Sequence, residues 1–182
     1  NIRTWIKIKN VHKEIAKHFK IKKTLTKKKI YYCDHHTSHI FSSYYYSGFN
    51  KSLALSIDGA GESATSVLGY FKKKKFYKLN EVHYPHSLGF FYSTITQFLG
   101  FQPDNHEYKV MGMAAYANPK YKDKLSKLIS FNKKGFSLNL EYFNFDNIEY
   151  PPFTKKFISE FGKPRDPESD EQNDPSNKNF LY

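Results

Sequence analysis

The stretch SLALSIDGAGE, residues 52–62, decides the fold. Its apolar residues Leu53, Leu55 and Ile57 alternate with smaller residues, which is the two-residue period of a β-strand. The period ends at Asp58, and the glycines that follow indicate a tight turn. We therefore predict a strand that ends in a carboxylate and a glycine turn.

Two further strands are predicted after this one. Residues 65–71 and 76–82 carry strand patterns, and the lysine run between them is expected to be a solvated hairpin tip. Three strands with short links predict an antiparallel meander. Ser87 is then expected to cap a helix over residues 88–99 that ends at a glycine. The predicted fold class is α/β, with a mixed sheet that contains the meander.

Three of the eight histidines lie in HHTSH, residues 35–39, before the first strand. We expect a helix that starts there and runs to about Tyr46. His35 and His39 are four residues apart and would lie on one helix face, so that their imidazoles could share a metal ion. His36 would point about 100° away and face a different surface.

Two imidazoles usually need a carboxylate as a third ligand, and Asp58 is the candidate. It follows a predicted strand, at the end where α/β sheets gather their ligands. The opposite interpretation stays open on spacing alone. An HxxxH pair in a basic protein is often incidental, and an Asp-Gly pair after a strand is often only a turn.

The glycine turn also has two interpretations. Gly59, Gly61 and Glu62 could belong to a loop that faces phosphate, or to a simple hairpin turn without the lysine pattern of a P-loop. Lys109 lies among hydrophobic residues in EYKVMG. It is either a surface lysine whose stem covers apolar neighbours or a phosphate partner.

The ends of the chain differ from its centre. Residues 1–29 are lysine-rich with helical spacing and predict a basic amphipathic lead-in. The main domain is expected over residues 30–150 and to open with a short strand at 30–33. Residues 151–182 are rich in Pro and acidic residues and predict a loop or linker. Weaker patterns predict helices and a strand in three further segments: 107–119, 121–130 and 136–145.

The composition is that of a globular protein. The chain has 182 residues, about one domain, and is 39% hydrophobic. No run approaches the roughly 20 apolar residues of a membrane-spanning helix. No secretory signal is visible, and the single cysteine, Cys33, excludes an internal disulfide framework. These features predict a cytoplasmic protein with no membrane partner.

The net charge of +12 raises the possibility of nucleic-acid binding. Of the 29 basic residues, however, only Arg3 and Arg165 are arginine. Specific readout of phosphates and bases favours the guanidinium group, which binds through two hydrogen bonds. A nucleic-acid partner is therefore not expected.

Four stretches in this order resemble one family: HHTSHIFSSYY, LALSIDGAGE, PHSLGFFYSTITQFLGF and EYKVMGMAAYANP. They are similar to the N-terminal domain of the O-carbamoyltransferases, which modify nodulation factors, cephem antibiotics and aminoglycosides. The similarity covers about residues 30–119, and FGKPR at 161–165 continues it weakly. The resemblance implies part of an actin/Hsp70/sugar-kinase-like domain.

The resemblance also implies a reaction and its cofactors. Carbamoyl phosphate and ATP would form a carbamoyl-adenylate, whose carbamoyl group passes to a hydroxyl of a small molecule. A divalent metal, typically iron, would be held by the HxxxH pair and the strand-end aspartate, which are His35, His39 and Asp58 here. The nucleotide is then expected beside this metal, at the 59–62 loop, with Lys109 as a further cation.

The chain departs from the family pattern in two ways. No strand with a His-Asp-Ser segment precedes residue 30, and 182 residues cannot hold the downstream domain that handles carbamoyl phosphate. We therefore expect an internal fragment, inactive alone, that depends on the rest of the same polypeptide. The alternative is a non-catalytic module of the same fold that binds a nucleotide or metal.

Overall fold

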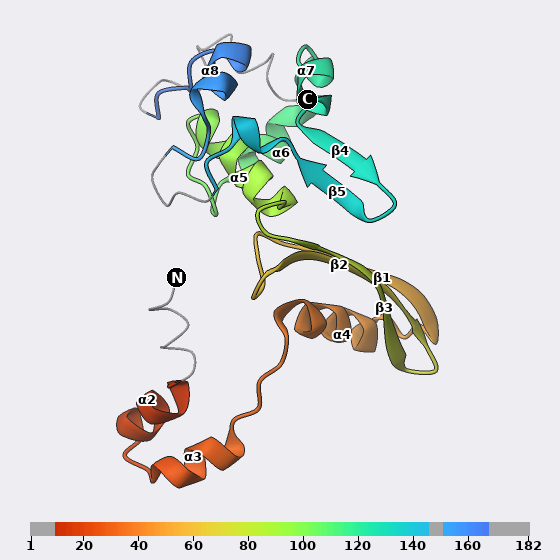
Figure 1. Ribbon diagram of the computed structural model, residues 1–182, viewed down its shortest axis with the longest axis vertical. Coiled ribbons are helices and arrows are strands. Elements are labelled where there is room, and N and C mark those ends of the chain that lie inside the picture. The colour runs from red at the N-terminus through yellow and green to blue at the C-terminus, as the bar shows by residue number, and fades with distance from the viewer. Residues whose placement is uncertain (1–9, 146–150, 168–182) are drawn as a thin grey trace. The chain divides into compact units, whose positions relative to one another are not determined.

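The computed structural model describes residues 10–145 and 151–167 (Figure 1). The chain divides into two compact units, residues 1–34 and residues 35–182. The first contains helices α2 (Val11–His18) and α3 (Lys23–Lys29), which contact each other. Both lie in the predicted helical lead-in, while residues 1–9 of that prediction lie outside the described residues.

The short strand predicted at residues 30–33 is wrong. This segment has no regular secondary structure, and Tyr31 and Tyr32 are exposed. A strand is stable only when a neighbouring strand accepts its backbone hydrogen bonds. None of the described strands pairs with this segment, so its apolar pattern was not sufficient.

The second unit opens with a helix and a three-stranded antiparallel sheet in the order β1-β2-β3. These elements are α4 (His35–Ser47), β1 (Lys51–Ile57), β2 (Ala64–Lys72) and β3 (Lys75–His83). The predicted meander is confirmed. The predicted hairpin tip is a turn with positive φ at Lys73 and Lys74, 51° and 63°.

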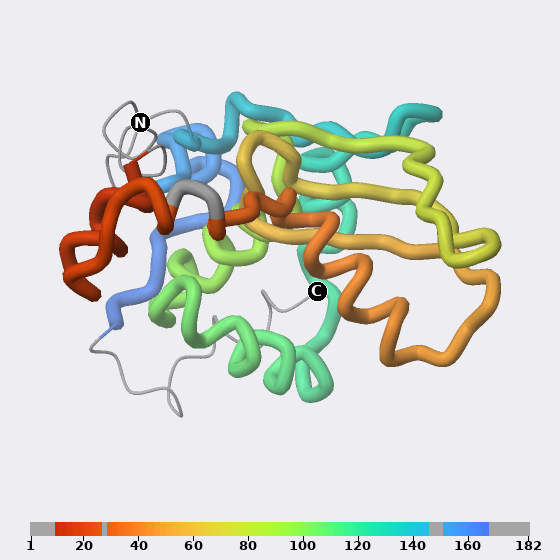
Figure 2. The backbone as a smooth tube through the Cα atoms, turned by 90° about the horizontal axis from the view of Figure 1, so that it is seen from below, coloured from red at the N-terminus to blue at the C-terminus, as the bar shows by residue number. Residues whose placement is uncertain are grey.

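Helix α4 packs along one face of this sheet (Figures 1 and 2). Ile40 and Tyr44 of α4 form a buried cluster with Val67 and Phe71 of β2. The Tyr44 ring stacks on Phe71 with 3.6 Å between the ring centroids. This packing fixes the helix over the sheet and carries its first turn toward the end of β1.

The remaining elements surround a larger core that is rich in phenylalanine. They are α5 (Leu88–Phe98), α6 (Glu107–Ala114), α7 (Lys122–Ser126), β4 (Ile129–Asn132), β5 (Gly135–Leu138), the 3-10 turn η1 (Leu140–Tyr142) and α8 (Lys155–Phe161). Helix α5 and its cap are confirmed, because the Ser87 side chain accepts a hydrogen bond from Phe90 N. The strand predicted at 136–145 is shorter and turns into η1.

Helix α8 corrects the prediction of a loop or linker after residue 150. Thr154 caps the helix by accepting a hydrogen bond from Phe157 N. Phe157 and Phe161 are buried in the larger core, so a four-residue apolar spacing holds this segment in place. The acidic, proline-containing composition of the whole tail concealed this short helical pattern. Residues 168–182 lie outside the described part of the chain.

The fold class is confirmed as a mixture of helices and β-sheet. Every strand pair in the described residues is antiparallel, so the expected mixed sheet is represented there by its antiparallel meander alone. Within the same residues, no helix has the length and apolar character needed to cross a membrane.

Candidate metal centre

The three predicted metal ligands converge at one end of the sheet. His35 and His39 lie near the start of α4, and Asp58 directly follows β1. The Nε2 atom of His35 is 2.6 Å from Asp58 Oδ2 and 3.2 Å from the Nε2 atom of His39. The Nε2 atom of His39 is 3.6 Å from the same carboxylate oxygen. Two imidazole nitrogens and one carboxylate oxygen therefore face a common point.

The triangle is close to the size that a metal ion requires. Metal–ligand bonds of about 2.0–2.2 Å keep neighbouring ligand atoms about 3.0–3.5 Å apart. The separations of 3.2 Å and 3.6 Å lie in or near this range, whereas the 2.6 Å contact between His35 and Asp58 is a hydrogen bond that an ion would replace. One proton on Nε2 of His35 cannot form a full hydrogen bond to both of its neighbours, whereas a cation can receive a lone pair from all three groups. In the described part of the chain, no other three His, Cys, Asp or Glu side chains lie close enough to hold a metal.

The side chains of the cluster are partly open to solvent. His35, His39 and Asp58 are 40%, 58% and 41% exposed, so water or a substrate can approach the same point. The hydrogen bond from His35 lowers the pKa of Asp58 below its usual value. Burial opposes this effect, while the backbone N–H of Gly59 and the nearby histidines add to it. Asp58 is thus held in the ionised form that a ligand needs.

His36 has a structural position, on a different surface from the ligand pair as predicted. Its side chain is fully buried, with Nδ1 2.7 Å from Ser56 Oγ and Nε2 3.0 Å from Ala64 O. Because a carbonyl oxygen only accepts, Nε2 carries the proton and Nδ1 accepts from the serine. His36 therefore ties α4 to β1 and β2 and orients the helix face that carries the two ligands.

The 59–62 loop packs against the start of α4. Gly59 N donates to Asp58 Oδ1 at 2.6 Å, and Gly61 N donates to Ala64 O at 2.7 Å. A carboxylate oxygen of Glu62 accepts a hydrogen bond from His35 N at 3.4 Å, so this acidic residue lies where an α-helix favours negative charge. A Cβ on Gly61 would come within 3.0 Å of the His35 Cβ. Enlarging Gly61 would thus press on His35, one of the three candidate ligands.

Two further residues hold the aspartate and were not recognised as site residues from the sequence. The Ser87 hydroxyl donates to Gly59 O at 2.6 Å and lies 3.2 Å from Asp58 O. The backbone of Gly89 comes so close that a Cβ there would lie 2.5 Å from Gly59 N. The PHSLGFF stretch was the available signal, but its serine was interpreted only as a helix cap.

His35, His39 and Asp58 together are called the metal cluster below, after the ion that they could hold. The structure does not bring Lys109 into this cluster. This residue is on α6, where its Nζ lies 5.7 Å from the centroid of the Phe101 ring. It lines a separate cavity of about 500 Å³ together with His106 and Gln97. The position fits the interpretation as a surface lysine, and its predicted contact with phosphate stays a prediction.

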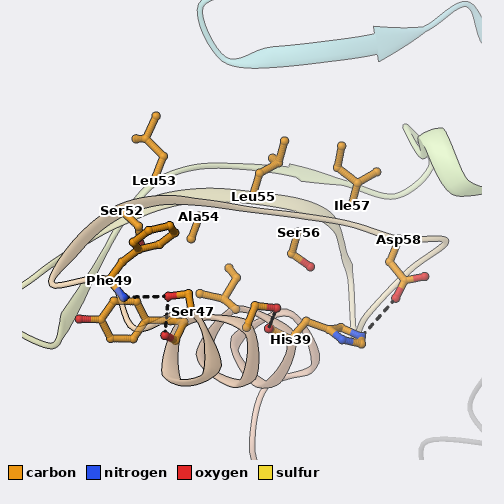
Figure 3. Close-up of a pocket in the computed structure, with 13 residues that line it drawn as sticks. His39, Ser47, Phe49, Ser52, Leu53, Ala54, Leu55, Ser56, Ile57 and Asp58 are labelled. Carbon is orange, nitrogen blue, oxygen red and sulfur yellow. Dashed lines mark hydrogen bonds and ion pairs between the residues drawn. The ribbon is translucent and has the colours of Figure 1, made fainter.

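A groove of about 570 Å³ runs from the metal cluster between α4 and β1 (Figure 3). His39 and Asp58 line one end, and Phe49 lines it near the start of β1. Small side chains of β1, including Ser52 and Ala54, face the groove (Figure 3). The metal cluster therefore opens into an elongated hollow along one strand.

Comparisons with known proteins identify the family of the chain. Residues 2–177 match the protein family described as Carbamoyltransferase N-terminus. Uncharacterized protein sll1178 of Synechocystis sp. is 41% identical over 139 residues, which are 75% of this chain and 22% of that protein. Nodulation protein NolNO of Sinorhizobium fredii is 37% identical over 91 residues, 50% of this chain and 13% of that protein.

Nodulation protein NolO of Bradyrhizobium diazoefficiens is also similar, with 35% identity over 86 residues, 47% of this chain and 16% of that protein. The chain thus spans less than a quarter of the length of these relatives. The family match covers almost the whole sequence, including the segments that carry the metal cluster. The chain belongs to the carbamoyltransferase family, in the region described as the N-terminus.

Proposed function

We propose that this chain supplies the metal-binding part of an ATP-dependent O-carbamoyltransferase of the cytoplasm. The observation that supports the proposal most directly is the convergence of His35, His39 and Asp58 in a chain of this family. Their segments would belong to an actin/Hsp70/sugar-kinase-like domain that other parts of a longer polypeptide complete.

The proposed reaction has three steps. Water first cleaves carbamoyl phosphate to carbamate and phosphate, and a carbamate oxygen then attacks the α-phosphorus of ATP, so that pyrophosphate leaves and a carbamoyl-adenylate forms. The hydroxyl oxygen of a small-molecule acceptor then attacks the carbamoyl carbon, and the bond to AMP breaks, so that AMP leaves. Holding the acceptor beside the activated carbonyl would supply much of the rate, because it removes the entropic cost of bringing the reactants together.

The residues of the cluster have distinct roles in this proposal. Two imidazoles and one carboxylate with open positions are the ligand set typical of non-haem Fe(II). A bound ion would supply positive charge to phosphate or carbamoyl oxygens. The N–H groups of Gly59 and Gly61 already donate within the loop. The glycines would therefore help by allowing a nucleotide to approach closely, and not by offering these amides.

Metal titration tests the proposal. Calorimetry with Fe(II) under anaerobic conditions, and with Mn(II) and Zn(II), is expected to show one strong site. His39→Ala should weaken it by more than about 100-fold, because it removes a ligand and even changes to residues behind the ligands cost about 10- to 100-fold. His83→Ala is the control, since this exposed histidine lies beside Glu81 and outside the cluster. Equal affinity in the two variants would contradict the proposed site.

A carbamoyl-transfer assay on the longer polypeptide tests the chemistry separately. Transfer that requires ATP, carbamoyl phosphate and His39 would support the enzyme. The small share of its relatives that this chain covers keeps a second function open, a non-catalytic module that binds a nucleotide or metal. Metal and ATP binding without carbamoyl transfer in the complete protein would favour that module.

A further inference from the structure

Five lysines meet at the tip of the hairpin formed by β2 and β3. The strand register places Lys51 of β1 opposite Lys72 of β2, and Lys72 opposite Lys75 of β3. Lys73 and Lys74 form the turn between β2 and β3. All five side chains are exposed, and within the described part of the chain no carboxylate forms an ion pair with any of them. We call these five residues the lysine tip.

The lysine tip is unfavourable for the sheet itself. Directly opposed residues have Cβ atoms about 4.5–5.5 Å apart, and like charges at such positions destabilise a strand pair. The tip contains two such pairs, Lys51 with Lys72 and Lys72 with Lys75. Its turn has positive φ at Lys73 and Lys74, 51° and 63°, where glycine or asparagine is favoured. The local structure therefore gives no reason for this cluster of cations, whereas a bound anion would relieve the repulsion between them.

A row of apolar and aromatic side chains lies next to the lysine tip on the same face of the sheet. Two residues away from the lysines along the strands, Leu53 lies opposite Tyr70, and Tyr70 lies opposite Tyr77. The two-residue period of a strand puts this row on the face of the lysine pairs, about 7 Å from them. Leu53 is 75% exposed and points away from α4, and Tyr77 is 38% exposed (Figure 3). Cations beside exposed leucine and tyrosine are typical of a surface that contacts lipid headgroups.

The same features fit a nucleic acid less well. Proteins that bind single-stranded nucleic acids offer aromatic faces on which the bases stack. The Tyr77 ring is already engaged, because it stacks on Tyr70 with 5.1 Å between the ring centroids, and Lys75 Nζ lies 5.5 Å from its centroid. The tip also contains no arginine, which binds phosphate through two hydrogen bonds. Lysine ammonium groups act as hydrated point charges, which suits a fluid layer of anionic headgroups.

We propose that the lysine tip binds the surface of an anionic phospholipid membrane. The ammonium groups would lie among the lipid phosphates, while Leu53 and Tyr77 would reach the boundary between headgroups and acyl chains. This attraction acts over a Debye length and weakens as salt is added. The sequence-based prediction of no membrane partner rested on the lack of a membrane-spanning run and of a secretory signal, and a surface contact needs neither. The inference does not depend on the proposed chemistry, because it rests on the hairpin alone.

Co-sedimentation of the protein with vesicles tests the inference. Vesicles of equal parts phosphatidylcholine and phosphatidylglycerol should bind the protein at least about 10-fold more tightly than vesicles of phosphatidylcholine alone. Lys72→Glu should weaken binding to the anionic vesicles by at least about 10-fold, because it reverses the central charge of the tip. The same substitution turns both repulsive pairs into attractive ones, so the midpoint of urea unfolding should rise. A loss of binding in a more stable variant cannot result from a failure to fold.

Lys133→Glu is the matched control. Lys133 lies in the exposed turn of the other hairpin, between β4 and β5, and its substitution changes the net charge by the same amount. This variant should bind the anionic vesicles as tightly as the unchanged protein does. Equal losses in the two variants would overturn the inference, because the overall charge of +12 would then explain the binding. So would a lack of vesicle binding, or tighter binding of a single-stranded RNA oligonucleotide that Lys72→Glu abolishes, which would identify a nucleic-acid partner.

Discussion

Gly89 packs closely against the backbone of Asp58, one of the three candidate metal ligands. A Cβ at this position would lie 2.6 Å from the Asp58 carbonyl carbon, and a backbone atom cannot move aside as a flexible side chain can. Gly89→Ala is therefore expected to displace the aspartate loop. We expect the affinity of the Gly89→Ala variant for Fe(II) to fall by at least about 10-fold, as it does when other residues that orient metal ligands are changed. Anaerobic calorimetry measures the change.

Gly112→Ala is the control for this substitution. Gly112 is in helix α6, and a Cβ there meets nothing within 4 Å. The change should leave metal affinity unaltered and stabilise the helix by about 0.5–1 kcal/mol. If the Gly89→Ala and Gly112→Ala variants bound Fe(II) equally well, the close contact of Gly89 with the loop would not determine the position of Asp58.

Alanine substitutions at His36 and His39 should have different effects: the first should lower stability, and the second should weaken metal binding. His36→Ala removes the partner of the Ser56 hydroxyl and empties the space of a fully buried ring, while Ala64 O keeps its hydrogen bond from Gly61 N. The free energy of unfolding should fall by about 3 kcal/mol. The His39 side chain is more exposed. His39→Ala should therefore change the free energy of unfolding by no more than about 0.5 kcal/mol in metal-free buffer. Urea unfolding gives both values. A larger loss for His39→Ala would reverse the two roles.

Among the elements, α5 links the metal loop to the larger core. Its first turn holds the loop through Ser87, and its last turn buries Phe98, which packs edge-on against Phe153 and Phe157. Phe98→Ala should therefore cost about 3–5 kcal/mol of unfolding free energy. Phe91 of the same helix is only partly buried, so Phe91→Ala should cost less.

Tyr116→Ala provides the comparison for this core substitution. This ring is 88% exposed, and its removal should change the unfolding free energy by no more than about 0.5 kcal/mol. Chemical denaturation of both variants is the measurement. Similar small losses in both would show that Phe98 does not lie in a tightly packed core.

The elements that were predicted correctly carry their information locally. Helix α4 has a glycine stop, and β1 to β3 have short links and a regular period. The strand predicted at 30–33 failed because strand stability depends on a partner that local sequence does not identify. Helix α8 was missed for a different reason, since its two buried phenylalanines lie in a segment whose overall composition is polar.

At the scale of the whole molecule, the convergence of the three candidate ligands was predictable from the sequence, and the contacts that support them were not. The pair His35 and His39 follows from helix geometry alone, and Asp58 from the end of a strand. The roles of His36, Ser87 and Gly89 depend on contacts between elements, which no local spacing contains. A contact between Lys109 and phosphate likewise cannot be inferred from its neighbours in sequence, and it stays a prediction.

The metal cluster and its supports all lie between residues 35 and 89. This closeness along the chain has a consequence for biosynthesis. A ribosome adds about 5–20 residues per second, so the ligands and their supports leave the exit tunnel within seconds of one another. Residues 90–182 follow the last of these supports along the chain. We expect the nascent chain to be able to bind a metal ion once residue 89 has left the exit tunnel, before residues 90–182 have folded.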